Sequence, residues 1–169
     1  MTLSMYQASV PVIVHNLKNL SAILQKAEEF AASKKIDQSV LVNARLAPDM
    51  FPLSRQVQIA CDVTRRGVGR LAGVEAPSYE DTEKTFAELQ TRIANNIKFI
   101  EGLKPEQIDG SEGKVVNLKV GGNDMTFAGQ PYLLNFVLPN LFFHVSVAYG
   151  ILRHNGVDLG KKDYLGPIQ

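Results

Sequence analysis

The chain has 169 residues, of which 45% are hydrophobic and 21% are charged, a composition typical of globular rather than disordered proteins. Its 18 Lys and Arg residues almost balance 17 Asp and Glu residues, so the net charge of +1 gives no long-range field that would attract nucleic acid. One cysteine, Cys61, excludes an intramolecular disulfide framework, and the length fits a single domain over residues 1–169.

A first helix is predicted from about residue 4 to residue 33. Apolar residues recur there at alternating steps of four and three, which places them on one helical face: Ile13, Leu17, Leu20, Leu24, Ala27 and Ala31. Pro11 either kinks this helix or marks its true start. Residues 1–6 lack the basic and apolar regions of a secretory signal, so we expect a cytoplasmic protein. Residues 34–49 lack clear periodicity and are interpreted as a loop with room for a short helical turn.

A second helix is predicted to begin with Asp49 as its N-cap and Pro52 in its first turn, and to stop at Gly73. Its expected buried stripe consists of Val57, Ala60, Cys61, Thr64, Val68 and Leu71. The basic run Thr64–Arg70 is interpreted as a solvated face of this helix, with phosphate binding as the alternative. Cys61 is expected to be a buried small residue rather than a reactive thiol.

A third helix is predicted to begin after Pro77. The segment Ser78–Asp81 has the Ser-x-x-acid form of a capping box, which indicates a helix N-terminus. Residues at helical spacing follow it: Phe86, Leu89, Ile93, Ile97 and Ile100.

Two short apolar runs, 115–120 and 125–127, flank Gly121–Asp124 and predict a small β-hairpin. The last helix is expected over Gln130–His154, terminated by Asn155 and Gly156. Residues 132–152 contain no Lys, Arg, Asp or Glu and reach the length of a membrane span. Polar residues and a proline within this segment would need partners in lipid, so we interpret it as the central helix of a soluble bundle.

The sequence contains no glycine-rich phosphate loop and no nucleophile elbow of the Gly-x-Ser-x-Gly form. Three histidines are present, and we expect His15 at a surface or edge position and His154 at a helix C-terminus. His144 lies in an apolar stretch and needs a polar partner if it is buried. Asn140 is one helical turn earlier on the same face, so these two residues either line a polar pocket or bond to neighbouring helices.

The segment from Arg45 to Leu53 is apolar for a loop, yet it contains Arg45 and Asp49. One interpretation is that the segment packs against the helices. The alternative is a lid over the bundle interior, with Asp49 or Arg45 pointing into a cavity.

Three stretches carry a resemblance to a known family: Ser4–Pro11, Arg45–Leu53 with Gln56 and Val57 after it, and His144–Val157. Together they resemble a bacterial family of unknown function within the DinB/YfiT-like superfamily. The resemblance covers nearly the whole chain. It implies an all-α, antiparallel four-helix bundle with a small β-hairpin before the last helix, and a protein that is often dimeric.

The resemblance also bears on metal binding. Many superfamily members hold a divalent metal with one histidine from the second helix and a His-x-x-x-His pair from the last helix. Matching the Leu152-Arg153-x-Asn155-Gly156 ending places His144 at the last histidine and Asn140 at the other position of the pair. The second helix, 49–73, contains no histidine, so we expect no metal and no cofactor. If zinc, nickel or manganese does bind, His144 is the best candidate ligand, with Asp49, Asp62 or His15 as conceivable partners.

The leading hypothesis is therefore a DinB-like bundle with a polar pocket for a small-molecule ligand. The expected pocket residues are Asn140, His144, Asp49, Arg45 and Gln56. One alternative is a metal-dependent, thiol-using transferase or a hydrolase in which a carboxylate joins His144. Another is a structural homodimer whose helix faces carry the function. We expect no nucleic-acid and no membrane partner, and the sequence assigns no reaction.

Overall fold

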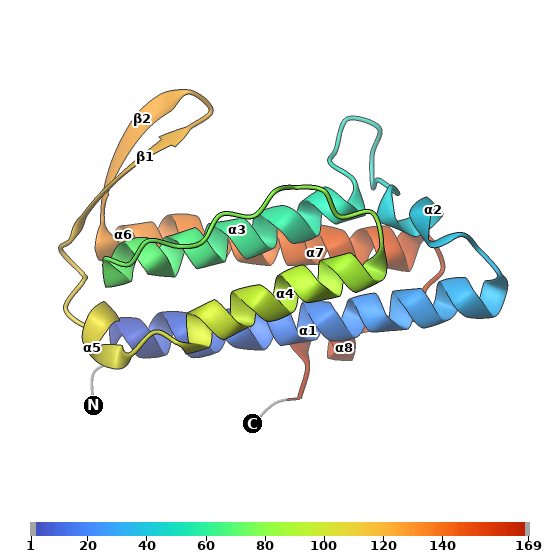
Figure 1. Ribbon diagram of the computed structural model, residues 1–169, viewed down its shortest axis with the longest axis horizontal. Coiled ribbons are helices and arrows are strands. Elements are labelled where there is room, and N and C mark those ends of the chain that lie inside the picture. The colour runs from blue at the N-terminus through green and yellow to red at the C-terminus, as the bar shows by residue number, and fades with distance from the viewer. Residues whose placement is uncertain (1–2, 168–169) are drawn as a thin grey trace.

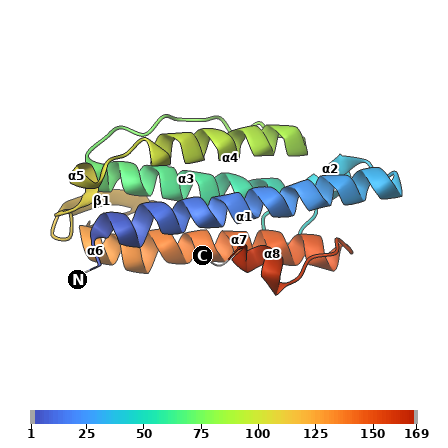
Figure 2. The same ribbon diagram turned by 90° about the horizontal axis from the view of Figure 1, so that it is seen from below.

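The computed structural model describes residues 3–167 and is mostly helical. Its four long helices are α1 (Met5–Lys34), α3 (Leu53–Ala72), α4 (Phe86–Glu101) and α7 (Leu138–His154). They lie side by side (Figures 1 and 2), and α3 packs against α7 and α4 while α1 packs against the same two helices. The shorter elements are α2 (Gln38–Val42), α5 (Pro105–Ile108), α6 (Gly129–Tyr132), a π-helical turn η1 (Leu133–Val137), α8 (Lys161–Leu165) and the strands β1 (Val115–Val120) and β2 (Asn123–Ala128).

Helix α1 follows its predicted pattern closely. Ser4 is the N-cap and forms a capping box with Gln7, and all six residues of the predicted apolar face are buried. Pro11 lies inside the helix, so it does not mark the start. The predicted loop after α1 contains α2, whose N-cap is Asp37.

Helix α3 begins later than predicted, with Pro52 at the N-cap position and no side-chain cap, so the assignment of Asp49 as N-cap is wrong. The backbone N–H of Leu53 donates to the carbonyl of Ala44. This bond joins the two ends of the loop 44–52 just before the helix starts. The predicted stripe is buried, and Gly73 ends the helix with φ of 71°.

The prediction that a helix begins at Ser78–Asp81 is wrong. Helix α4 begins at Phe86, and its capping box is formed by Thr85 and Glu88. Residues 74–84, here called the strap, run without helix or strand structure from the end of α3 to the start of α4 (Figure 1). The strap stays out of the helix because two arginines bind its backbone carbonyls, as described below.

The predicted hairpin is present as an antiparallel pair, with Val115 opposite Ala128 and Val120 opposite Asn123. Gly121 and Gly122 form the turn with φ of 57° and 86°, values that glycine adopts without strain. The hairpin projects from the helices at the α6 end of the molecule (Figure 1).

The last helical segment, Gly129–His154, is long and apolar enough to cross a membrane by length and composition alone. It packs against α3 and α1, and residues such as Leu141, Val145 and Ile151 are fully buried there, as in a core helix. The segment is not one regular α-helix, because η1 interrupts it between α6 and α7. Asn155 caps its end, and Gly156 has φ of 92°.

Candidate functional site

His144 on α7 and Gln56 on α3 meet inside the molecule. His144 is 8% exposed, and its Nδ1 lies 2.7 Å from Oε1 of Gln56. The Nε2 of Gln56 donates a hydrogen bond of 3.0 Å to the carbonyl of Phe51, which can only accept, so the orientation of the amide is fixed. Oε1 of Gln56 therefore faces the imidazole, and Nδ1 of His144 must carry the proton.

This pairing leaves a lone pair on Nε2 of His144. Within residues 3–167, Nε2 has no hydrogen-bond partner. The atom is not completely enclosed, so part of it reaches solvent. Burial, and then the nearby charge of Arg55, lowers the pKa of His144 to about 4. The imidazole is therefore neutral at pH 7, and Nε2 is a hydrogen-bond acceptor, a base or a nucleophile.

Asn140 supplies a second acceptor one turn earlier on α7. Its Nδ2 donates a 2.6 Å hydrogen bond to the carbonyl of Phe136, which fixes this amide as well. The Oδ1 of Asn140 has no partner in the described part of the chain, and it is likewise not fully enclosed. Nε2 of His144 and Oδ1 of Asn140 are thus two acceptors at an i, i+4 spacing on one helix.

Aromatic and cationic side chains lie near His144: the ring centre of Phe143 is 5.2 Å from that of the imidazole, and the charge of Arg55 acts on the imidazole. Phe51 and Phe143 are 54% and 56% exposed, and the guanidinium of Arg55 lies 5.9 Å from the centre of the Phe51 ring. Phe51, Arg55 and Phe143 are not among the pocket residues expected from the sequence. Arg55 and Phe143 directly precede Gln56 and His144 in the sequence, and this adjacency was the available signal.

Arg45 and Asp49 lie in the loop between α2 and α3, and both are exposed. The guanidinium of Arg45 donates to the carbonyl of Met50 within the same loop. Neither residue forms a hydrogen bond or ion pair with His144 or Asn140 in the described structure. Leu46 lies against Gly150 of α7, so this loop packs on the helix that carries His144.

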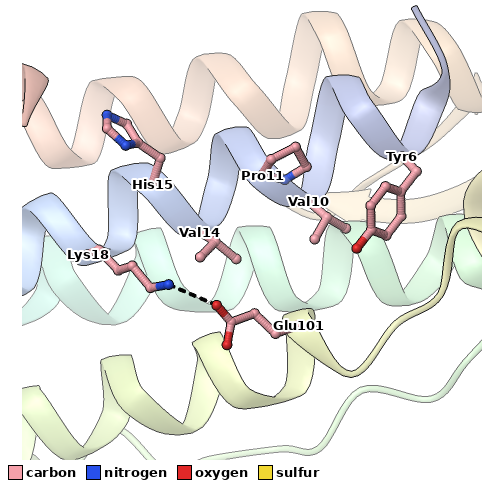
Figure 3. Close-up of a pocket in the computed structure, with 7 residues that line it drawn as sticks. All are labelled: Tyr6, Val10, Pro11, Val14, His15, Lys18 and Glu101. Carbon is pink, nitrogen blue, oxygen red and sulfur yellow. Dashed lines mark hydrogen bonds and ion pairs between the residues drawn. The ribbon is translucent and has the colours of Figure 1, made fainter. Parts of the chain in front are cut away.

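His15 lies in a different part of the molecule. It lines a groove of about 350 Å³ formed by α1 and the end of α4, together with Tyr6, Pro11 and the Lys18–Glu101 ion pair (Figure 3). Its Nε2 lies 2.6 Å from the carbonyl of Leu165 and 3.1 Å from Nδ2 of Asn19, so this nitrogen is already engaged by polar neighbours.

Asp62 forms ion pairs with arginines rather than a contact with His144. Its Oδ1 lies 2.7 Å from Nη2 of Arg92 and 2.9 Å from Nη2 of Arg65. Arg65 is fully buried, and Thr64 and residues 67–69 are buried as well. The interpretation of the run Thr64–Arg70 as a solvated face is therefore wrong except at Arg66 and Arg70, which are exposed. Arg65 lies four residues after Cys61, and this helical spacing already placed it on the buried stripe.

The residues present do not fit a three-histidine metal centre. Among residues 3–167, no three His, Cys, Asp or Glu side chains are grouped closely enough to hold a metal ion. The side chains around His144 are the amides of Asn140 and Gln56, and Oε1 of Gln56 is already used by the imidazole. Cys61 is buried, and burial raises its thiol pKa to about 12, which makes it a poor nucleophile.

Residues 5–165 match a family described as a domain of unknown function, DUF1993. The chain belongs to this family. The DUF1993 chain is also similar to the crystal structure of a DinB family member protein from Shewanella denitrificans, with 45% identity over 96% of this chain and 92% of that chain, and a TM-score of 0.87. No curated protein matches it. The DinB-like relationship expected from the sequence is thereby confirmed.

Proposed function

We propose that this DUF1993 protein is a cytoplasmic, single-domain, antiparallel four-helix bundle that binds a small molecule at His144 and Asn140 without a metal ion. The observation that carries the proposal is the fixed pairing of Gln56 with Nδ1 of His144, which presents a neutral Nε2 acceptor to the ligand. Because His144 is buried near a guanidinium, its pKa is lowered, and the folded protein should lose stability at acidic pH. Side chains with strongly shifted pKa values are concentrated at functional sites.

The chemistry of the surrounding side chains defines the ligand class. Two acceptors, Nε2 of His144 and Oδ1 of Asn140, require a hydrogen-bond donor such as a hydroxyl group. The exposed rings of Phe51 and Phe143 favour an aromatic or apolar body next to that donor. The proposed ligand is therefore a small aromatic or apolar molecule with a hydroxyl or N–H group.

The first test compares 4-methylphenol with 4-methylanisole, which has the same ring but no hydroxyl donor. Binding is followed through the ring nitrogen and proton NMR signals of His144 in the purified protein. The phenol should shift these signals at lower concentration than the ether. In Asn140→Leu, which removes the second acceptor, the shift should need more phenol, whereas His154→Phe should behave as the unmodified protein, since His154 lies exposed at the end of α7. Equal effects of both compounds would contradict the proposal.

A metal-dependent transferase or hydrolase remains the competing enzyme hypothesis, and elemental analysis of the untagged protein distinguishes it. The absence of zinc, nickel and manganese, and no change in melting temperature on adding each of them, is the expected result. One metal per chain that is lost in His144→Ala would overturn the metal-free proposal.

One observation favours homodimer formation as a second candidate function. Helices η1 and α7 expose Leu134, Phe142 and Phe143 on a segment that has no charged side chain between residues 132 and 152. Exposed apolar side chains on an uncharged segment suit an isologous contact with a second copy. Light scattering after size exclusion should give the mass of a dimer, and Phe142→Glu should give that of a monomer. A monomer in the unmodified protein would reject this candidate.

A further inference from the structure

The strap, residues 74–84, is held in place by two arginines that are almost completely buried. Nε of Arg65 donates 2.8 Å to the carbonyl of Pro77, and Nη1 of Arg92 donates 3.0 Å to the carbonyl of Glu80. Arg92 also binds the carboxylate of Glu83 at 2.7 Å. Because these bonds fix backbone atoms from the α3 and α4 side, they hold the strap in one conformation along these helices (Figure 1).

Most of the remaining strap backbone has no partner. Within the described residues, the N–H groups of 75, 76 and 78–83 donate no hydrogen bond to protein, and only the carbonyls of Pro77 and Glu80 accept one. A fixed chain with unpaired N–H and C=O groups resembles the free edge of a sheet, to which an added strand can bind.

A groove follows the strap where it faces α4. One hollow of about 400 Å³ lies beside Tyr79, Glu80 and Arg92, and a second of about 550 Å³ lies beside Val74, Tyr79 and Phe99. The two hollows share Tyr79 and Asn95, so they are neighbours along the strap, and the pair is called the groove below.

The two halves of the groove differ in chemistry. The first half is lined by Glu80, Glu83 and Glu88. Its cation, Arg92, is 1% exposed and pairs with Glu83, so Glu80 and Glu88 are the lining carboxylates without an ion-pair partner in the described residues. The other half contains Val74, Phe99 and Leu103, with Lys98 as its charged residue. The acidic half therefore suits a basic partner, and the apolar half suits an aliphatic side chain.

We propose that this groove binds an extended basic peptide, which adds to the free backbone edge of the strap and places its cationic side chains beside Glu80. A polyamine would match the charge but offers no acceptor. The strap presents N–H donors that have no hydrogen-bond partner in the described residues. Peptide carbonyls satisfy such donors, so a peptide fits better than a polyamine.

The test uses the seven-residue peptide acetyl-Lys-Val-Lys-Leu-Lys-Val-Lys-amide, added to the full chain labelled with ¹⁵N. Amide signals of residues 75, 76 and 78–83 and of the second half of α4 should shift, and hydrogen exchange should slow at alternate strap residues, as strand addition requires. The same peptide with N-methyl groups on alternate amides should bind at least about tenfold more weakly, which corresponds to about 1.4 kcal/mol. Equal binding of both peptides, or equal shifts with spermidine, would overturn the proposal.

Two variants and a control locate the site. Asn95→Trp places a large side chain where the hollows meet, and Glu80→Lys reverses the charge of the acidic half; both residues are exposed, so the fold should persist. Each should weaken binding, whereas Glu28→Lys on the exposed face of α1 should not. Unchanged binding in both groove variants, with circular dichroism showing an intact fold, would reject this surface as the peptide site.

Discussion

Arg65 of α3 donates a 2.9 Å hydrogen bond from Nη1 to Oδ1 of Asn96 on α4, and neither side chain is exposed to solvent. The same guanidinium binds the carbonyl of Pro77, while its Nη2 lies 2.9 Å from Asp62 without the geometry of a hydrogen bond. One buried cation therefore joins two long helices and the strap. Its neighbour in sequence, Arg66, is exposed and reaches only the outer oxygen of Asp62 at 3.4 Å.

These two adjacent arginines should differ greatly in their contribution to stability. Arg65→Ala should lower the free energy of unfolding by about 3–5 kcal/mol, because it leaves Asn96 and Pro77 unpaired and opens a cavity. Arg66→Ala should cost less than about 1 kcal/mol, as exposed ion pairs do. Urea denaturation measures both, and similar losses in the two variants would contradict the assigned role of Arg65.

The lowered pKa of His144 predicts a specific pH dependence. The folded protein binds this proton only near pH 4, whereas the unfolded chain binds it near pH 6.5. Between these values the unfolded state holds more protons, so the free energy of unfolding should fall as the pH decreases, by up to about 3 kcal/mol. His144→Gln should lack this component, and His154→Gln should retain it. Parallel pH profiles of the unmodified protein and His144→Gln would show that the pKa is not lowered.

Gly129 should tolerate no side chain. A Cβ at this position would lie 1.9 Å from the carbonyl oxygen of Ser111, a backbone atom, so the start of α6 would have to move. Gly129→Ala should cost about 1–3 kcal/mol and disturb the base of the hairpin. Gly113→Ala, where nothing lies within 4 Å of the added atom, is the matched control and should leave the melting temperature nearly unchanged.

The start of α4 can be tested at its two competing capping sequences. Thr85→Ala removes the hydroxyl that accepts from the N–H of Glu88 and should cost about 1 kcal/mol. Ser78→Ala changes an exposed strap residue and should cost almost nothing. Thermal unfolding distinguishes the two, and a larger loss in Ser78→Ala would indicate that the helix begins at the earlier site.

Local signals predicted much of the fold. The apolar faces of α1 and α3 follow from helical spacing, Gly73 and Gly156 adopt positive φ at helix ends, and Gly121 and Gly122 form the hairpin turn. These features depend on neighbours within a few residues, so they can be predicted from the sequence alone.

The start of α4 could not be predicted in the same way. Ser78–Asp81 and Thr85–Glu88 both have the form of a capping box, and the choice between them depends on two arginines from α3 and α4 that bind the strap. The candidate site likewise combines local features with features that depend on helix packing. Asn140 and His144 share one helix face, whereas the contact of His144 with Gln56 and the proximity of Arg55 depend on how α3 packs against α7.

The π-helical turn Leu133–Val137 also affects how this chain is compared with its relatives. A π turn accommodates one residue more than an α turn, so everything after it is rotated by roughly 100° relative to an uninterrupted helix. Any relative without the turn should align with a one-residue gap between positions 133 and 137. Counting along the helix from Gly129 without that gap would pair His144 with a position one residue away, whereas counting back from Asn155 and Gly156 does not cross the inserted residue.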